Sequence, residues 1–135
     1  MIIRPFEKRD LVWLRPMAEK WGDFNECKAM ADDPDKFGLL TALVVAPYTI
    51  GVIFYDTHGA VLEGLCDDYG IKQFIRLGDY MVKVADEAGI DLHNHKWGQK
   101  PWYSRVLTRL GFEKTIPEVG HIRIASSGQA KKEVA

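Results

Sequence analysis

The chain of 135 residues carries a formal net charge of −1 and is 47% hydrophobic, which is ordinary for a single globular domain. It has no basic block that would mark a nucleic-acid or anionic-membrane surface, and no apolar run near the ~20 residues of a membrane span. Cys27 and Cys66 lie outside metal or redox spacing, as expected for buried, reduced thiols. Residues 1–5 lack the layout of a signal peptide. We therefore expect a cytoplasmic domain that binds neither nucleic acid nor membrane.

The first part of the chain predicts a short strand followed by two helical segments. Residues 2–6 form the strand. Asp10 is a favourable N-cap for the amphipathic stretch behind it. Pro16 falls inside that stretch, so we expect the helix to kink or divide there. A second helix is predicted over residues 21–30, and the turn-forming residues 32–35 should end it.

The middle of the chain predicts three strands joined by short turns. The first, over residues 39–46, is strongly apolar, so we expect it to be largely buried. Pro47 turns the chain into a second strand over residues 50–55. A tight turn at His58-Gly59 then leads into a third strand over residues 60–65. Sequential strands with such short connections form an antiparallel meander.

The segment after the third strand predicts the longest helix, over residues 71–88. Gly89 should end it, because glycine enters the left-handed conformation of a C-cap without strain. The strand, turn and helix over residues 60–89 leave backbone N–H groups pointing out of the helix N-terminus, which is a generic anion cradle. Residues at steps of three and four form one apolar stripe along the helix, namely Phe74, Leu77, Met81, Val84, Ala85 and Ala88.

The last part predicts a strand, a helix and a hairpin. Residues 90–97 alternate like a strand, with unusually polar positions on one face. Residues 102–110 read as a short helix that Gly111 ends. Residues 112–125 form a final hairpin, and the polar residues 126–135 are expected to be disordered.

Three segments of the chain match, in the same order, the sequence pattern of one known protein superfamily. Residues 2–6 resemble the pattern's usual opening, and residues 74–89 align without gaps to its cofactor helix. Residues 105–112 end in a basic residue, Leu, Gly and Phe, as its late helix does. Over roughly residues 1–125 the chain therefore resembles the GNAT acetyltransferase superfamily, and in particular the short members found in bacteriophages.

The resemblance implies a fold and an activity. The fold is α/β (α+β), with a mixed, mostly antiparallel sheet of about six or seven strands, three or four helices, and a V-shaped split between strands four and five. One GNAT-like domain over residues 1–125 is expected, with a disordered tail over residues 126–135. The implied activity is acetyl-CoA-dependent N-acetylation of an amine on a protein or small molecule.

In the family, the pyrophosphate of acetyl-CoA binds at the turn before the long helix. Neither possible register of this turn, over residues 69–74 or residues 67–72, satisfies the family motif, and Asp67 and Asp68 also bring negative charge to it. A carboxylate about 6 Å from a phosphate costs about 2.8 kcal/mol at an effective dielectric constant of about 20. Asp68 could also cap the helix, and Lys72 could offset part of the repulsion. By resemblance, the cofactor-binding residues are Leu65, Cys66, Gly70, Ile71, Lys72 and Gln73.

A second departure concerns the late helix. The family often places an Asn eleven residues before the Gly of its Gly-Phe pair and a Tyr four residues before it, and these positions hold Lys100 and Leu107 here. The family's tyrosine donates a proton to the departing CoA thiolate, a role worth roughly 10²–10⁴-fold in rate. Tyr103, one helical turn earlier on the same face, is the nearby replacement.

Three further residues are catalytic candidates. Glu63 is the carboxylate inside the strand over residues 60–65, and by resemblance it could act as general base through a water; the alternative is a solvent-facing strand residue. His93 and His95 share one strand face and could serve as base or substrate contact, or be solvated edge residues. A His-x-His pair can also chelate zinc, but no third ligand stands at motif spacing, so we expect no metal site.

Two functions from different classes are therefore consistent with the sequence. One is a divergent acetyltransferase that uses Glu63, His93, His95 or Tyr103. The other is a catalytically degenerate GNAT-fold protein that binds and modulates a host protein, with the aromatic cluster around Trp102 as a contact surface. The departures at Asp67, Asp68 and Leu107 favour the second, and the family resemblance favours the first.

Overall fold

The structure is a computed structural model of the chain. Several expectations from the sequence lie outside the residues that the structure describes, among them the disordered tail over residues 126–135, the position of His95 and the possible capping role of Asp68. Those residues are 2–20, 22–46, 48–57, 59–67, 70–94, 101–114 and 120–125.

Seven strands within the described residues form one sheet in the order β1-β2-β3-β4-β5-β7-β6. All neighbouring strands are antiparallel except β4 and β5, which are parallel. The sheet is therefore mixed and mostly antiparallel, as the resemblance implied. The predicted meander is confirmed as β2, β3 and β4. The strands are β1 (Ile3–Pro5), β2 (Leu39–Val45), β3 (Thr49–Asp56), β4 (Gly59–Leu65), β5 (Leu92–Asn94), β6 (Glu113–Lys114) and β7 (His121–Arg123).

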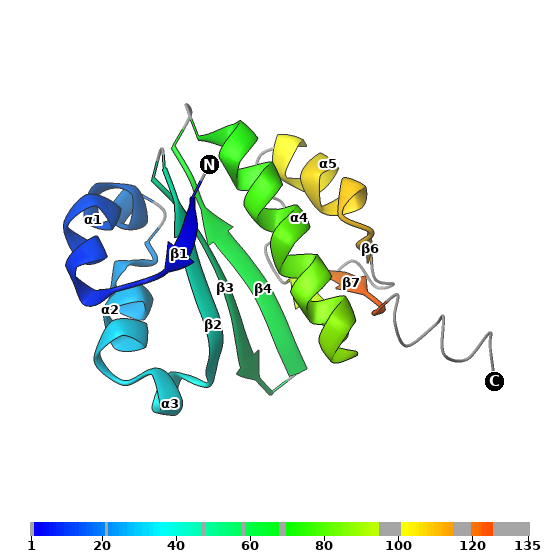
Figure 1. Ribbon diagram of the computed structural model, residues 1–135, viewed down its shortest axis with the longest axis horizontal. Helices are drawn as coiled ribbons and strands as arrows, with labels where there is room; N and C mark the ends of the chain where they lie inside the picture. Colours follow the sequence, from blue (N-terminus) through cyan, green and yellow to red (C-terminus); the bar gives the residue numbers. More distant parts are fainter. Residues whose placement is uncertain are drawn as a thin grey trace.

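Helices cover both faces of the sheet (Figure 1). α1, α2 and α3 pack on one face through a core that includes Leu14, Met30 and Ile50. α4 and α5 pack on the other face through a core that includes Leu77 and Leu107. A 3₁₀ turn, η1 (Lys8–Asp10), precedes the α-helices α1 (Leu11–Lys20), α2 (Phe24–Asp32), α3 (Pro34–Phe37), α4 (Ile71–Ala88) and α5 (Pro101–Arg109).

The long helix α4 has the predicted bounds. Its apolar stripe packs against the sheet, with Leu77, Met81 and Ala85 buried. Gly89 adopts the left-handed conformation, with φ of 69°, and its N–H bonds back to carbonyls of the last turn. The 3.6-residue period and the terminal glycine therefore determine this element locally.

Three features of the N-terminal half differ from the sequence expectations or add to them. Pro16 does not divide α1, because it shares the exposed face with Val12, whose carbonyl loses its helical partner on the solvent side. Residues 32–35 end α2 as expected, and Asp33 also accepts from the Lys36 N–H at 3.2 Å and starts the short α3. With α3, the described residues contain five α-helices, where three or four were expected. β2 is not largely buried, since Leu40 is 48% exposed.

Asp10 is not a simple N-cap of α1 but the centre of a buried polar cluster. Its carboxylate accepts two hydrogen bonds from the Arg4 guanidinium, at 2.9 and 2.6 Å. It also accepts from the Glu7 backbone N–H at 2.7 Å and from the Trp13 indole N–H at 2.8 Å. The carboxylate thus points back toward β1 and η1, because η1 runs directly into α1 and occupies the place of a cap. This cluster ties the first strand to the first helix.

Burial alone would raise the pKa of Asp10, but the hydrogen bonds from Arg4, Trp13 and Glu7 outweigh it and lower the pKa from 3.8 to about 2. A carboxyl whose pKa is lower in the folded state stabilises the fold above pH 4, by about 2 kcal/mol here, and loses this contribution as the pH falls toward 2.

Replacing Asp10→Asn should therefore lower the free energy of unfolding at pH 7 by about 2 kcal/mol, because the ionised acceptor is lost. Urea denaturation at pH 7, 4 and 2 measures this difference, which should shrink between pH 4 and pH 2. Asp79→Asn, on the exposed face of α4, is the control and should change little. An equal loss at pH 7 and pH 2 would contradict a role for the charge.

Candidate functional site

The site lies where the parallel strands β4 and β5 meet. β4 pairs with β3 along its whole length, from the pair Asp56–Gly59 to the pair Ile50–Leu65. Among the described residues, β4 pairs with β5 at a single position, where Val61 lies opposite His93. β4 therefore extends past its short ladder with β5, and Glu63 lies in this extension. A short parallel ladder at this place agrees with the V-shaped split that the resemblance implied.

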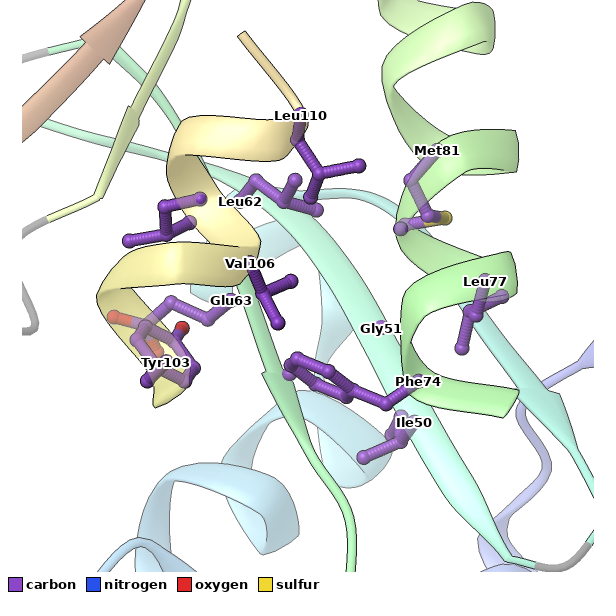
Figure 2. A pocket seen from close by; sticks show the side chains of 13 residues that line it. Ile50, Gly51, Leu62, Glu63, Phe74, Leu77, Met81, Tyr103, Val106 and Leu110 are labelled. Atoms are coloured by element: carbon purple, nitrogen blue, oxygen red, sulfur yellow. The ribbon is translucent and has the colours of Figure 1, made fainter. Parts of the chain in front are cut away.

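One pocket in the described part of the chain lies between α4 and α5, above β3 and β4 (Figure 2). We call it the α4–α5 pocket; it has a volume of about 380 Å³, including space open to solvent. Among its described lining residues, only Glu63 and Tyr103 have polar side chains, and Figure 2 shows them close together at one end. The other lining residues are Ile50, Gly51, Leu62, Gly64, Phe74, Leu77, Gly78, Met81, Val106, Leu107 and Leu110.

Glycine at position 64 gives this pocket its shape. A Cβ added to Gly64 would lie 2.7 Å from the Phe74 ring and 2.8 Å from the backbone oxygen of Ile50. The absence of a side chain lets the Phe74 ring lie directly over β4, where it meets the Trp102 ring edge-on at a centroid distance of 5.9 Å. The first turn of α4 can therefore approach the strand that carries Glu63.

The second pocket, which we call the α2 pocket, lies on the opposite face of the sheet and measures about 430 Å³, including open space. Three carboxylates line it, from Asp23 and Glu26 at the start of α2 and from Glu63 on β4. No cationic side chain is among its described lining residues, and its remaining side chains are apolar or Cys27. The two pockets share Ile50, Glu63 and Gly64, so Glu63 stands between them.

Tyr103 has an unusual electrostatic environment. Burial raises the pKa of its hydroxyl well above the usual value of 10, and the negative charges of Glu63 and Asp23 raise it further. A hydrogen bond from the Asn94 side chain acts in the opposite direction. The phenol therefore keeps its proton at neutral pH, which is the state that a proton donor needs.

Asn94, the last residue of β5, is a site residue that the sequence reasoning missed. Its side chain is fully buried, and its Nδ2 donates to the Leu62 carbonyl at 2.8 Å and to the Tyr103 hydroxyl oxygen at 3.0 Å. Sequence periodicity holds a signal for it, because Asn94 shares its strand face with the buried Leu92. An amide on a buried face requires a partner.

The N-terminus of α4 holds the residues expected to bind cofactor. Gly70 is the N-cap and makes no side-chain capping bond; its own N–H donates to the Asp67 carbonyl at 3.1 Å. A Cβ there would lie 3.2 to 3.4 Å from Thr49, Asp67 and Cys66, so a glycine suits this tight turn. Ile71, Lys72 and Gln73 form the first helical turn, and Asp68 lies outside the described residues.

Of the remaining candidates, His93, Leu65 and Cys66 do not line the α4–α5 pocket, and His95 lies outside the described residues. His93 is half-buried, and its ring lies 3.6 Å from where a Cβ of Gly59 would be, at the opposite end of β4 from Glu63. Leu65 lines the α2 pocket, and Cys66 follows it as a thiol that is half-buried rather than buried, like Cys27.

The described part of the chain holds no group of His, Cys, Asp and Glu side chains arranged to bind a metal ion. Within the same residues, no helix is both long and apolar enough to span a lipid bilayer.

Comparison with known proteins yields a structural match. No protein-family model matches the sequence, and no curated protein does. Among solved structures, a chimera of spermidine N-acetyltransferase from Vibrio cholerae and hSSAT is similar, with a TM-score of 0.59 and 11% sequence identity. The match covers 96% of this chain and 99% of that chain. Together with the parallel β4–β5 pair and the order of the elements, it shows that this chain has the GNAT acetyltransferase fold.

Proposed function

We propose that this protein is an N-acetyltransferase that transfers the acetyl group of acetyl-CoA to an amine. The observation that carries the proposal is the convergence of Glu63 and Tyr103 at one end of an otherwise apolar pocket, beside the β4–β5 opening of a GNAT fold. A carboxylate and a protonated phenol in apolar surroundings are suited to general base and general acid catalysis.

The backbone at the N-terminus of α4 is suited to bind the pyrophosphate of acetyl-CoA, but the charged side chains there are less well suited to it. Gly70 at the N-cap has no side chain that could bond the first-turn N–H groups of Ile71, Lys72 and Gln73. The ammonium of Lys72 is exposed beside them, and the exposed carboxylate of Asp67 opposes it. These residues would hold the pyrophosphate, and the bound thioester would supply the activated acetyl group.

Glu63 and Tyr103 would move the two protons of the reaction. As the amine nitrogen bonds to the acetyl carbon and the carbon–sulfur bond breaks, Glu63 takes the proton that the amine loses, directly or through a water. Tyr103 gives its hydroxyl proton to the departing sulfur. Glu63 lines both pockets, so it can reach an amine held on one face of the sheet and an acetyl group held on the other.

The α2 pocket suits a cationic, aliphatic acceptor. Its three carboxylates attract positive charge, and its apolar floor accommodates a methylene chain. Glu63 alone would pair with the reacting amine, so Asp23 and Glu26 would pair with a second charge. The structural neighbour's name specifies spermidine, a polyamine, as that enzyme's substrate. We therefore include small polyamines as the acceptor class to be tested first.

Tyr103→Phe and Glu63→Gln should each lower kcat by roughly 10²–10⁴-fold with little change in acetyl-CoA affinity, because each removes a proton transfer and not a binding contact. Release of the CoA thiol with spermidine as acceptor measures kcat, and calorimetry measures affinity. Matched controls are Tyr80→Phe and Glu113→Gln, at exposed positions. Normal turnover in both site variants would contradict these assignments.

Asp67→Asn should tighten acetyl-CoA binding about two- to fivefold, because an exposed like charge near the pyrophosphate is worth up to about 1 kcal/mol. Calorimetry at low and high salt checks this, and the gain should diminish as salt rises. Asp79→Asn, farther along α4, should have no effect. Unchanged affinity would show that the pyrophosphate does not approach this turn.

Glu26→Gln should raise KM for spermidine about two- to fivefold and leave KM for a monoamine of similar length unchanged. Glu26 is exposed at the pocket rim, so it would pair with the second charge of a polyamine. Steady-state kinetics with both amines provides the measurement. An equal effect on both acceptors would place the second charge elsewhere.

Two features favour the alternative, a GNAT-fold protein that binds a protein partner without catalysis. Leu107 stands where the family has its tyrosine, and it is buried in the pocket wall. Asp67 adds negative charge where the cofactor's phosphates would bind. Absence of both acetyl-CoA binding and CoA release in the wild-type protein would favour this function over the enzyme.

A further inference from the structure

Asn94 connects three elements through one side-chain nitrogen. It lies at the end of β5, bonds the backbone of β4 at Leu62 and bonds the side chain of Tyr103 on α5. Its side chain is completely buried, and these contacts join residues that lie 32 and 9 positions away in the sequence. A single amide group thus holds the phenol against the strand that carries Glu63.

The chemistry of the partners determines how the amide is oriented. The Leu62 carbonyl can only accept a hydrogen bond, so the atom 2.8 Å from it must be the amide nitrogen and not the amide oxygen. The same nitrogen is 3.0 Å from the Tyr103 oxygen, so its second N–H donates to the phenol. The Tyr103 oxygen therefore accepts from Asn94, and its own hydrogen points away from that amide.

This arrangement matters most when Tyr103 loses its proton. A phenolate in an apolar site is costly, because burial disfavours the charged form. A donor that is already in place bonds a developing anion more strongly than a neutral oxygen. The Asn94 N–H is such a donor, and its effect on the pKa of Tyr103 is opposite to that of burial.

We propose that Asn94 is a positioning residue for catalysis: it directs the Tyr103 hydroxyl hydrogen toward the pocket and stabilises the negative charge that forms on the phenol oxygen. This role rests on the proposed acetyltransferase function, in which Tyr103 protonates the departing sulfur. Asn94 itself contacts neither reactant. Its contribution acts entirely through Tyr103.

Asn94→Ala should lower kcat roughly 10- to 100-fold, the range expected for a hydrogen bond to a charged group, with acetyl-CoA affinity unchanged. In a Tyr103→Phe background the same substitution should have little further effect, because the group through which Asn94 acts is gone. CoA-release kinetics on wild type, both single variants and the double variant measures this coupling. Asn25→Ala, an exposed amide on α2, is the control.

A second measurement tests the geometry without turnover. In ¹⁵N-edited NMR spectra, the Asn94 side-chain amide signals are identified by their loss in Asn94→Ala, and Tyr103→Phe should shift them. Tyr80→Phe, an exposed tyrosine on α4, should leave them unchanged. If Asn94→Ala fails to fold because the Leu62 carbonyl is left without a donor, Asn94→Ser identifies the signals and takes its place in the kinetics.

The outcomes separate the two levels of the proposal. A wild-type protein that releases no CoA contradicts the proposed function and, with it, this role of Asn94. Turnover in the wild type, combined with an Asn94 effect of equal size in the Tyr103→Phe background, overturns this role alone. Amide signals that do not respond to Tyr103→Phe also overturn it.

Discussion

The hydrogen bonds of the Asn94 amide are the constraint on which the arrangement of the site depends. Within the described residues β4 and β5 share only a short ladder, and at its end the side-chain amide of Asn94 bonds the Leu62 carbonyl. The same group holds Tyr103, so the strand pair and α5 are placed relative to each other by one buried donor. Because a buried carbonyl without a donor costs about 1–3 kcal/mol, this contact supports the fold as well as the site.

A second polar contact keeps the two helices around the pocket in position. Arg123 on β7 bonds both oxygens of Asp86 near the end of α4, at 2.5 and 2.8 Å, and donates to the Leu110 carbonyl after α5 at 2.6 Å. The guanidinium is buried, so its planar fork holds both helices to the same strand. On the side of α4 and α5, Glu63 and Tyr103 face an apolar wall, and Phe74 approaches closely over Gly64. A carboxylate and a phenol act far more strongly on a reaction in such surroundings than in water.

Elements with a strong local pattern were predictable from the sequence. The period of its apolar stripe and the terminal Gly89 placed α4 at its observed bounds. The short turns of the meander predicted β2, β3 and β4 as antiparallel neighbours, and the order of all elements led to the GNAT fold. Glu63 and Tyr103 were also identifiable as candidates, because each carries a reactive group inside or next to a predicted element.

Only the tertiary structure decided which of these groups meet. Glu63 and Tyr103 are far apart in the sequence, and they converge because α5 packs on the face of β4. His93 lies on the neighbouring strand opposite Val61, and its ring lies beside Gly59 at the start of β4. Asn94 and Asp10 have their roles through partners on other elements, which no local period reveals. Periodicity determines which face of an element is buried, whereas long-range packing and strand register determine which polar groups share that buried space.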